Sequence, residues 1–241
     1  MVRFFVDPDV FLEDTVILTG ENAAHAKVLR LKNREEVILC DGQGNESVCI
    51  VEDASQPRLS VTERRTSVTE PRIEATVYIA MPKADKLEHV IQKATELGAH
   101  EIVAFPSARC ISRPDEKSLY KKLERWQKIA ASAAEQCGRG RIPRVTILSS
   151  YNEALSAAAK ADIGIVFYEN EHAVTLHDTL GQKEYQTISL LSGPEGGLEV
   201  SEIEQAAAAG LRVCTLGSRI LRCETAPLCA LSAVMYDAGE F

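Results

Sequence analysis

A glutamate enclosed by glycines is the first candidate for chemistry in this chain. Glu195 stands in the segment "LLSGPEGGLEVSEIEQ" at 190–205, with glycines at 193, 196 and 197. Glycine lets a backbone approach a bound molecule closely, and it also permits the positive φ of a tight turn. The segment has neither the Lys-Ser/Thr pair of a phosphate loop nor the G-x-G-x-x-G spacing, which disfavours nucleotide phosphate binding by those motifs. Two interpretations remain, a ligand-binding loop and a plain strand-to-helix turn.

A second unusual loop, "LGSRILRCETAP", follows at 216–227. Ile220 and Leu221 lie between Arg219 and Arg222 in this loop, and apolar loop residues usually bury against something. The partner is either the flat face of an adenine or a neighbouring helix, and the sequence leaves both open. The proline near its end is typical of a helix start.

The elements that position these loops follow two patterns along the chain. Up to about residue 70, short β-branched or alternating runs are separated by turn residues, and "DGQGN" within 36–53 predicts a hairpin. This pattern predicts a small, mostly β, barrel-like domain over 1–70, interrupted by a helix at 21–31. From 73 to 241 strands alternate with helices, which predicts parallel pairing and an α/β domain.

In a parallel α/β sheet, ligands bind beyond the carboxyl ends of the strands. The expected strands at 163–169, 185–193 and 212–217 lead into the loops "YENEHA", "SGPEGG" and "LGSRILRCETAP". We therefore expect these three loops to share one edge of the sheet. Ser201 and Glu204 have the S-x-x-E spacing of a capping box, which predicts that the next helix starts near residue 202.

Composition indicates a globular protein. The 241 residues are 45% hydrophobic, enough for a sizeable core. The seven cysteines include no C-x-x-C pair, so neither a disulfide framework nor a metal site is expected. No apolar run approaches 18 residues, and the start "MVRFFVDPDVFLED" has acids and a proline where a signal peptide is apolar. We expect a cytoplasmic protein without a membrane partner.

The net charge of -8 argues against a nucleic-acid partner, but its distribution is uneven. Between 106 and 145 basic residues clearly outnumber acidic ones. Phosphates respond to the nearby field rather than to the total charge, so this basic segment is compatible with RNA binding. A solvated helix face explains the same charges.

Four segments in order resemble the RsmE family, the ribosomal RNA uracil N3-methyltransferases of the knotted SPOUT superfamily. They are "KADKLEHVIQKATELGAHEI", "RWQKIAASAAEQCGRGRIP", "LLSGPEGGLEVSEI" and "LGSRILRCETA", and they span about residues 83 to 226. The N-terminal portion resembles the family's PUA-like barrel. The resemblance implies a PUA-like β-barrel RNA-binding domain at 1–70 and a SPOUT α/β-knot methyltransferase domain at 73–241, with a deep trefoil knot that periodicity could not reveal.

The resemblance also implies S-adenosylmethionine as cofactor, cradled by both candidate loops. The implied cofactor-binding residues are Leu191, Gly193, Glu195, Gly196, Gly197, Leu216, Gly217, Ile220, Leu221, Arg222, Thr225 and Ala226. Family members usually have Ser or Thr where this chain has Glu199, so we expect the helix cap to shift to Ser201 and the loop to be slightly remodelled.

The implied reaction methylates N3 of a specific uridine, uracil-1498 of 16S rRNA in the family, in the small ribosomal subunit. N3 carries a proton, so the site needs a base and a cation or donor that stabilises charge on the ring oxygens, but no metal. Glu195 or Glu224 is the candidate base, and Arg222 the candidate stabilising cation. Glu224 could instead pair with Arg222 or favour the helix start, and Glu195 could merely orient its loop.

The candidate RNA contacts are basic residues of both parts of the chain, namely Arg109, Arg113, Arg139, Arg141, Lys27 and Arg30. The resemblance further implies a homodimer. Two alternatives stay open, a knotted methyltransferase acting on another RNA position such as ribose 2'-O, and an inactive RNA-binding protein with the same fold.

Overall fold

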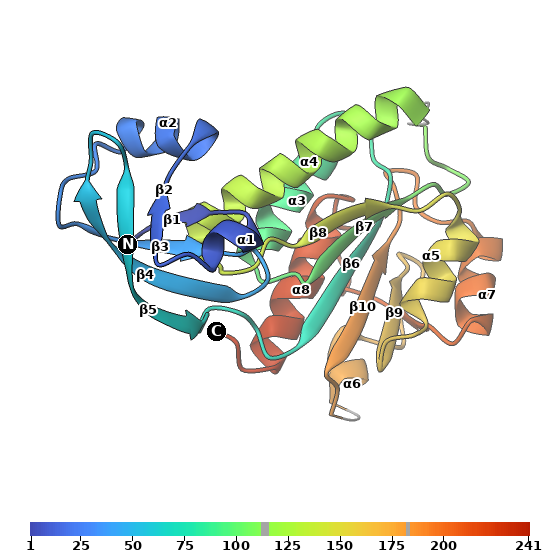
Figure 1. Ribbon diagram of the computed structural model, residues 1–241. Coiled ribbons are helices and arrows are strands. Elements are labelled where there is room, and N and C mark those ends of the chain that lie inside the picture. The colour runs from blue at the N-terminus through green and yellow to red at the C-terminus, as the bar shows by residue number, and fades with distance from the viewer. Residues whose placement is uncertain (112–115, 182–183) are drawn as a thin grey trace. The chain divides into compact units, whose positions relative to one another are not determined.

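The chain divides into two compact units in the computed structural model, which describes residues 1–111, 116–181 and 184–241 (Figure 1). The first unit comprises Met1–Glu70 and Ala131–Ile142, and the second comprises Pro71–Ala130 and Pro143–Phe241. The sequence suggests a change of pattern near residue 70, but it gives no sign that 131–142 joins the first unit.

The first unit is built on one five-stranded sheet in the order β1-β3-β4-β5-β2. The strands are β1 (Val2–Phe5), β2 (Thr15–Ile17), β3 (Glu36–Cys40), β4 (Asn45–Asp53) and β5 (Arg58–Thr66). β1 and β3 pair in parallel, and the other neighbours pair antiparallel. The β3–β4 pair confirms the predicted hairpin, and Asp41 Oδ1 stabilises its turn by accepting from the N–H groups of Gln43 and Asn45.

Two helices accompany this sheet, α1 (Pro8–Phe11) and α2 (Gly20–Val28). α2 confirms the expected helix, whereas the single turn of α1 is too short to show periodicity. Apolar side chains such as Phe4, Leu39 and Leu59 are fully buried in the core of this unit. The curled, mostly β architecture is PUA-like.

The second unit contains a six-stranded, wholly parallel sheet in the order β11-β9-β10-β6-β7-β8. Its strands are β6 (Glu74–Ala80), β7 (Glu101–Phe105), β8 (Arg144–Ile147), β9 (Ile163–Phe167), β10 (Thr187–Ser192) and β11 (Arg212–Cys214). Its helices are α3 (Lys86–Glu96), α4 (Glu116–Cys137), whose end belongs to the first unit, α5 (Tyr151–Ala158), α6 (Leu176–Leu180), α7 (Val200–Ala208) and α8 (Thr225–Asp237). The predicted α/β architecture with a parallel sheet is confirmed, and it is SPOUT-like.

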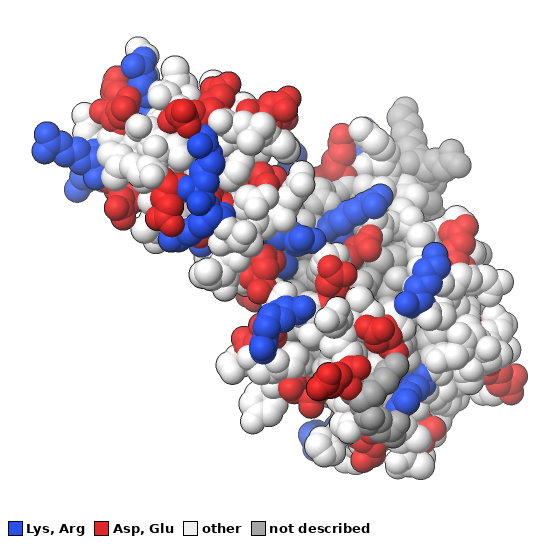
Figure 2. All heavy atoms as spheres, turned by 60° about the horizontal axis from the view of Figure 1, so that its bottom comes forward, with Lys and Arg blue, Asp and Glu red and all other residues white. Residues whose placement is uncertain are grey.

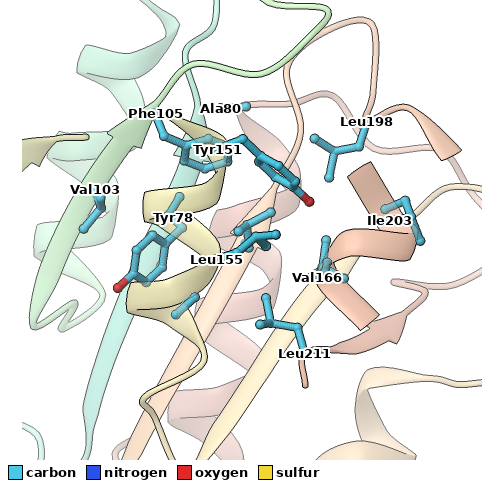
Figure 3. Packing of buried hydrophobic residues seen from close by; sticks show 14 of the residues in the cluster. Tyr78, Ala80, Val103, Phe105, Tyr151, Leu155, Val166, Leu198, Ile203 and Leu211 are labelled. Atoms are coloured by element: carbon cyan, nitrogen blue, oxygen red, sulfur yellow. The ribbon is translucent and has the colours of Figure 1, made fainter. Parts of the chain in front are cut away.

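Helices cover both faces of this sheet (Figure 1). On one face Tyr78 and Ala80 of β6 pack in a core with Tyr151 and Leu155 of α5 and with Ile203 of α7 (Figure 3). Because successive strand residues point to opposite faces, the buried residues between them, such as Val77 and Ile79, face α8 on the other side. A sheet covered in this way leaves its strand ends for function.

The direction of the chain through the sheet reverses between β6 and β10. From β6 the chain proceeds through β7 to β8 at one edge, and then returns to β9, β10 and β11 on the other side of β6. Such a switch point opens a crevice at the carboxyl ends of the two strands. The loops that follow β6 and β10 are therefore expected to meet over it.

The start of α7 differs from the expectation. The helix begins at Val200, with Glu199 as its N-cap, and the backbone N–H of Glu199 donates to Glu202 Oε2 at 2.8 Å. The predicted cap of Ser201 with Glu204 is therefore wrong. The cap forms with Glu202 rather than Glu204 because the buried carboxylate of Glu202 also accepts from the N–H of Ala108 at 2.9 Å, which fixes it beside the helix start.

Candidate active site

A cavity of about 560 Å³ lies at the carboxyl ends of β9, β10 and β11. Its walls are the loop after β9, residues 192–198 after β10, and residues 215–223 after β11, with Lys86 and Ala226. The three loops predicted to share this edge of the sheet are therefore brought together. The volume is within the range of roughly 300–1,000 Å³ typical of small-molecule sites.

The glycines of the loop after β10 are required by its geometry. Gly197 has a φ of +69°, and a Cβ at this position would lie 2.5 Å from Glu169 Oε1 of the neighbouring loop. Its N–H donates to Pro194 O at 2.9 Å, which closes a tight turn around Glu195. A Cβ on Gly193 would come within 3.1 Å of the Gly197 backbone. Turn geometry and close approach thus both demand glycine, and the turn is also a wall of the cavity.

The loop after β11 presents apolar side chains at the same cavity. Gly217 has a φ of +103°, and its N–H donates to Thr215 Oγ1. Ile220 lines the cavity and is 85% exposed, so it does not pack onto a neighbouring helix here. Leu221 is half-buried. Of the two interpretations of this loop, the one in which it offers apolar surface to a ligand fits the geometry of Ile220.

Lys86, the first residue of α3, connects the two loops. Its Nζ lies 3.2 Å from Glu195 Oε1 and 3.2 Å from Glu224 Oε2, and 3.6 Å from the Sγ of Cys223. The backbone N–H of Lys83 also donates to Glu195 Oε1 at 3.0 Å. The sequence alone does not reveal the role of Lys86, because only the adjacency of β6 and β10 brings the loop after β6 to this edge.

These contacts fix the ionisation of the site. Hydrogen bonds to Glu195 and Glu224 raise the pKa of Lys86 to about 12. Burial works against the charged form of both glutamates, but hydrogen bonds from backbone N–H groups and from Lys86 outweigh it and hold the pKa of each below its usual value. Burial raises the pKa of the Cys223 thiol to about 11, and this thiol donates to Glu224 Oε2 at 3.2 Å. At neutral pH the site therefore holds two carboxylates, one ammonium and a neutral thiol.

The remaining residues predicted to bind the cofactor differ in whether they line the cavity. Leu191 is fully buried in the core below the cavity, and Thr225 is exposed at the start of α8, so neither lines it. Arg222 lines the cavity with an exposed side chain, while its carbonyl accepts from the N–H groups of Thr225 and Ala226 at 2.8 and 2.9 Å. The other predicted residues that line the cavity are Gly193, Glu195, Gly196, Gly197, Leu216, Gly217, Ile220, Leu221 and Ala226.

The predicted RNA contacts have very different environments. Arg139 is 4% exposed, and its Nη2 lies 2.7 Å from Glu70 Oε2. The same glutamate accepts from the N–H groups of Gly140 and Arg141. A guanidinium held in this way offers little surface to a phosphate, so we assign Arg139 a structural role.

Other members of this set are more accessible. Lys27 and Arg30 are exposed and Arg141 is half-buried, all within the first unit. Arg109 lies in the second unit and donates to Gly196 O at 2.9 Å, so it supports the loop after β10. Arg113 lies outside the described residues. On the face shown in Figure 2, basic and acidic side chains are interspersed.

Comparison with known proteins defines the class first. Residues 69–235 match an RNA methyltransferase domain, and residues 18–63 match an RNA methyltransferase PUA domain. The family model for the first domain covers most of the chain, including every loop of the cavity.

Individual relatives then give the family. The chain is 37% identical to ribosomal RNA small subunit methyltransferase E of Bacillus subtilis over 98% of its length and 97% of the relative's, and 33% identical to that of Mycobacterium tuberculosis over 96% and 90%. It also resembles the crystal structure of ribosomal RNA small subunit methyltransferase E from Neisseria gonorrhoeae bound to S-adenosylmethionine, with a TM-score of 0.87 and 33% identity over 98% and 97% of the two chains. The chain belongs to the ribosomal RNA small subunit methyltransferase E family.

Proposed function

We propose that this protein transfers a methyl group from S-adenosylmethionine to N3 of a uridine in small-subunit ribosomal RNA, the family's uracil-1498. The observation that carries the proposal is the cavity that the glycine loop after β10 and the apolar loop after β11 both line. Family membership supports methyl transfer to small-subunit RNA. The choice of N3 rests on the sequence resemblance.

The residues of the cavity fit this cofactor. Gly217 is open on its side-chain face, because no described atom beyond its two chain neighbours lies within 4 Å of the position that a Cβ would take, so a flat ring could lie against the backbone. Ile220 and Leu221 provide apolar contact for an adenine. Glu169 and Glu195 provide negative charge for an ammonium or a sulfonium. When bound, the cofactor supplies a methyl group already activated by positive sulfur, and the protein must prepare the acceptor.

The acceptor nitrogen must lose its proton, and the charged side chains divide this work. Glu195 is held by the Lys83 N–H and by Lys86, and we assign it to the cavity wall. Glu224 is the other candidate acid. It is also paired with Lys86 and adjoins Cys223 of the cavity wall, and we propose that it accepts the N3 proton. The exposed guanidinium of Arg222 then stabilises the negative charge that develops on the uracil oxygens.

We propose further that residues 1–70 form the RNA-binding domain and that the methyltransferase domain spans 73–241. A homodimer located in the cytoplasm is the expected working form. No helix in the described ranges combines the length and apolar character that a membrane crossing requires. No cluster of three or more potential metal ligands occurs among the described residues either.

A product assay tests the function. Undermethylated small subunits are incubated with S-adenosylmethionine and the protein, and the RNA nucleosides are identified by mass spectrometry. We expect 3-methyluridine, and Arg222→Ala should lower its rate of formation by roughly 10²-fold, the effect of removing one charge-stabilising donor. A 2'-O-methyl product would favour the other class of RNA methyltransferase. Failure to bind S-adenosylmethionine in a calorimetric titration would favour an inactive RNA-binding protein.

A further inference from the structure

Lys86 occupies an unusual place in the cavity, because one ammonium serves two acids on two different loops. Glu195 belongs to the loop after β10 and Glu224 to the end of the loop after β11, and both lie 3.2 Å from Lys86 Nζ. Each of the three side chains is less than one-third exposed, so solvent screens their interaction only in part.

The position of Lys86 itself is fixed by packing. It is the first residue of α3, which packs against α8, and the following residues Leu87, Val90 and Ile91 are buried. Because these buried side chains anchor the start of α3, the ammonium of Lys86 can hold the positions of the loops after β10 and β11, which carry fewer buried groups. Without it, two carboxylates would face each other across the place where Nζ lies, and like charges at that separation repel.

We propose that Lys86 is a positioning residue that holds Glu195 and Glu224 in place and thereby fixes the two loops that line the cavity. The inference rests on the proposed function, since those walls are the ones assigned to S-adenosylmethionine and Glu224 is the assigned proton acceptor. Lys86 acts through the two acids, and it stays protonated during the reaction.

The groups that face Lys86 determine how the effect of substituting this lysine depends on pH. Glu195, Glu224 and the Cys223 thiol surround its ammonium. The other charged or titratable side chains that line the cavity are Tyr168, Glu169, His172, Arg219 and Arg222, and Glu224 itself adjoins the lining residue Cys223. They are unchanged in a Lys86 variant, so comparison with the wild type at each pH isolates the response of Glu195 and Glu224.

The test is a calorimetric titration of S-adenosylmethionine into the wild type, Lys86→Met and Lys86→Arg at pH 5.5 and pH 7.5. Loss of two partly buried ion pairs predicts a dissociation constant about five- to tenfold higher for Lys86→Met at pH 7.5. The defect should shrink at pH 5.5, because mutual repulsion favours protonation of one carboxylate. Lys86→Arg should restore most of the affinity.

Lys93→Met is the matched control. Lys93 lies on the same helix and is paired with Glu96 at 2.7 Å, with similar exposure, but it does not line the cavity. Its substitution should leave the affinity unchanged. A double variant tests whether Lys86→Met merely disrupts the fold. Adding Glu224→Gln removes the repulsion between the two carboxylates and should bring the affinity for S-adenosylmethionine closer to that of the wild type.

Urea unfolding of the cofactor-free proteins separates this inference from the proposed function. As the pH is lowered from 7.5 to 5.5, the free energy of unfolding of Lys86→Met should rise relative to that of the wild type, whether or not the protein is a methyltransferase. Equal pH responses of the two proteins, or a binding defect that Glu224→Gln does not reduce, would overturn the role of Lys86. A wild type that fails to bind S-adenosylmethionine, with the pH response of unfolding intact, would overturn the proposed function alone.

Discussion

At the residue scale, the acids of the site are held in their ionised form. A carboxylate whose pKa lies below its usual value is a weak proton acceptor, so the role proposed for Glu224 depends on proximity rather than on basicity. The same ionisation keeps the Glu195 carboxylate of the cavity wall negative, which suits a positively charged sulfonium. The arrangement therefore favours holding the cofactor and orienting the acceptor over strong base catalysis.

Ionisation of Glu195 predicts a specific response of stability to acid. Because the pKa of this carboxyl in the folded protein lies below its usual value of 4.5, folding favours the charged form. This stability is complete above the pKa of the unfolded chain and is lost as the pH falls through the folded pKa. In urea unfolding, the stability difference between the wild type and Glu195→Gln should be largest near pH 7 and should vanish toward pH 3.

Glu204→Gln provides the control for this experiment. Glu204 is an exposed glutamate of α7 and does not line the cavity. Its substitution should leave the pH profile of unfolding that of the wild type. A constant difference between the wild type and Glu195→Gln from pH 3 to pH 7 would contradict a role for the Glu195 charge.

Residue types and the family resemblance together pointed to several candidates for the site, but not to the residue that connects them. Glu195 and Arg222 stand among glycines and apolar residues in loops that follow strands, and the reaction implied by the resemblance added Glu224. Lys86 looks like an ordinary lysine at a helix start, since its partners are far away in the sequence. Conversely, Arg139 belongs to a basic segment, and only the structure shows that Glu70 occupies its guanidinium.

At the element scale, the turn after β10 combines two constraints on one glycine. Gly197 needs its positive φ, and Glu169 fills the space that a side chain would need. Gly210 at the end of α7 has a similar φ of +94°, but no described neighbour lies within 4 Å of its side-chain position. Substitution of these two glycines therefore separates the free-energy cost of the left-handed backbone conformation from that of the contact with Glu169.

Gly197→Ala should destabilise the protein more than Gly210→Ala. The left-handed conformation costs about 1–2 kcal/mol for a residue with a Cβ, and the contact with Glu169 adds to it, so we expect about 1 kcal/mol for Gly210→Ala and about 3 kcal/mol for Gly197→Ala. Urea unfolding measures both. Only Gly197→Ala should also weaken binding of S-adenosylmethionine. Equal losses of stability would show that the loop yields to the added methyl group.

The order of strands could not be read from the sequence, although their existence could. Helical and strand periodicity predicted the parallel sheet, because those patterns are local. The adjacency of β6 and β10 depends on pairing between distant segments. The start of α7 was mispredicted because the buried Glu202, fixed by Ala108, competes successfully with the local signal at Ser201. The short helix α6 shows no periodicity, like α1.

At the scale of the whole molecule, an acidic protein must bind a polyanion. The net charge of -8 opposes long-range attraction, so binding depends on local basic surface. Lys27, Arg30 and Arg141 of the first unit are the accessible candidates, whereas Arg139 is committed to Glu70. These two kinds of basic residue should respond differently to substitution.

Arg141→Ala should reduce the slope of the logarithm of RNA affinity against the logarithm of salt concentration by about 1, as expected for one lost phosphate contact. Lys27→Ala and Arg30→Ala should act similarly, and none of the three substitutions should change stability greatly, because their side chains are accessible.

Arg139→Ala should instead lower the free energy of unfolding by about 3 kcal/mol, because it leaves the carboxylate of Glu70 without its buried partner. Filter binding of small-subunit RNA from about 50 to 200 mM salt, together with urea unfolding, measures both effects. Unchanged slopes for all three accessible variants would place the RNA footprint elsewhere, and a stable Arg139→Ala protein with a reduced slope would return Arg139 to the RNA contacts.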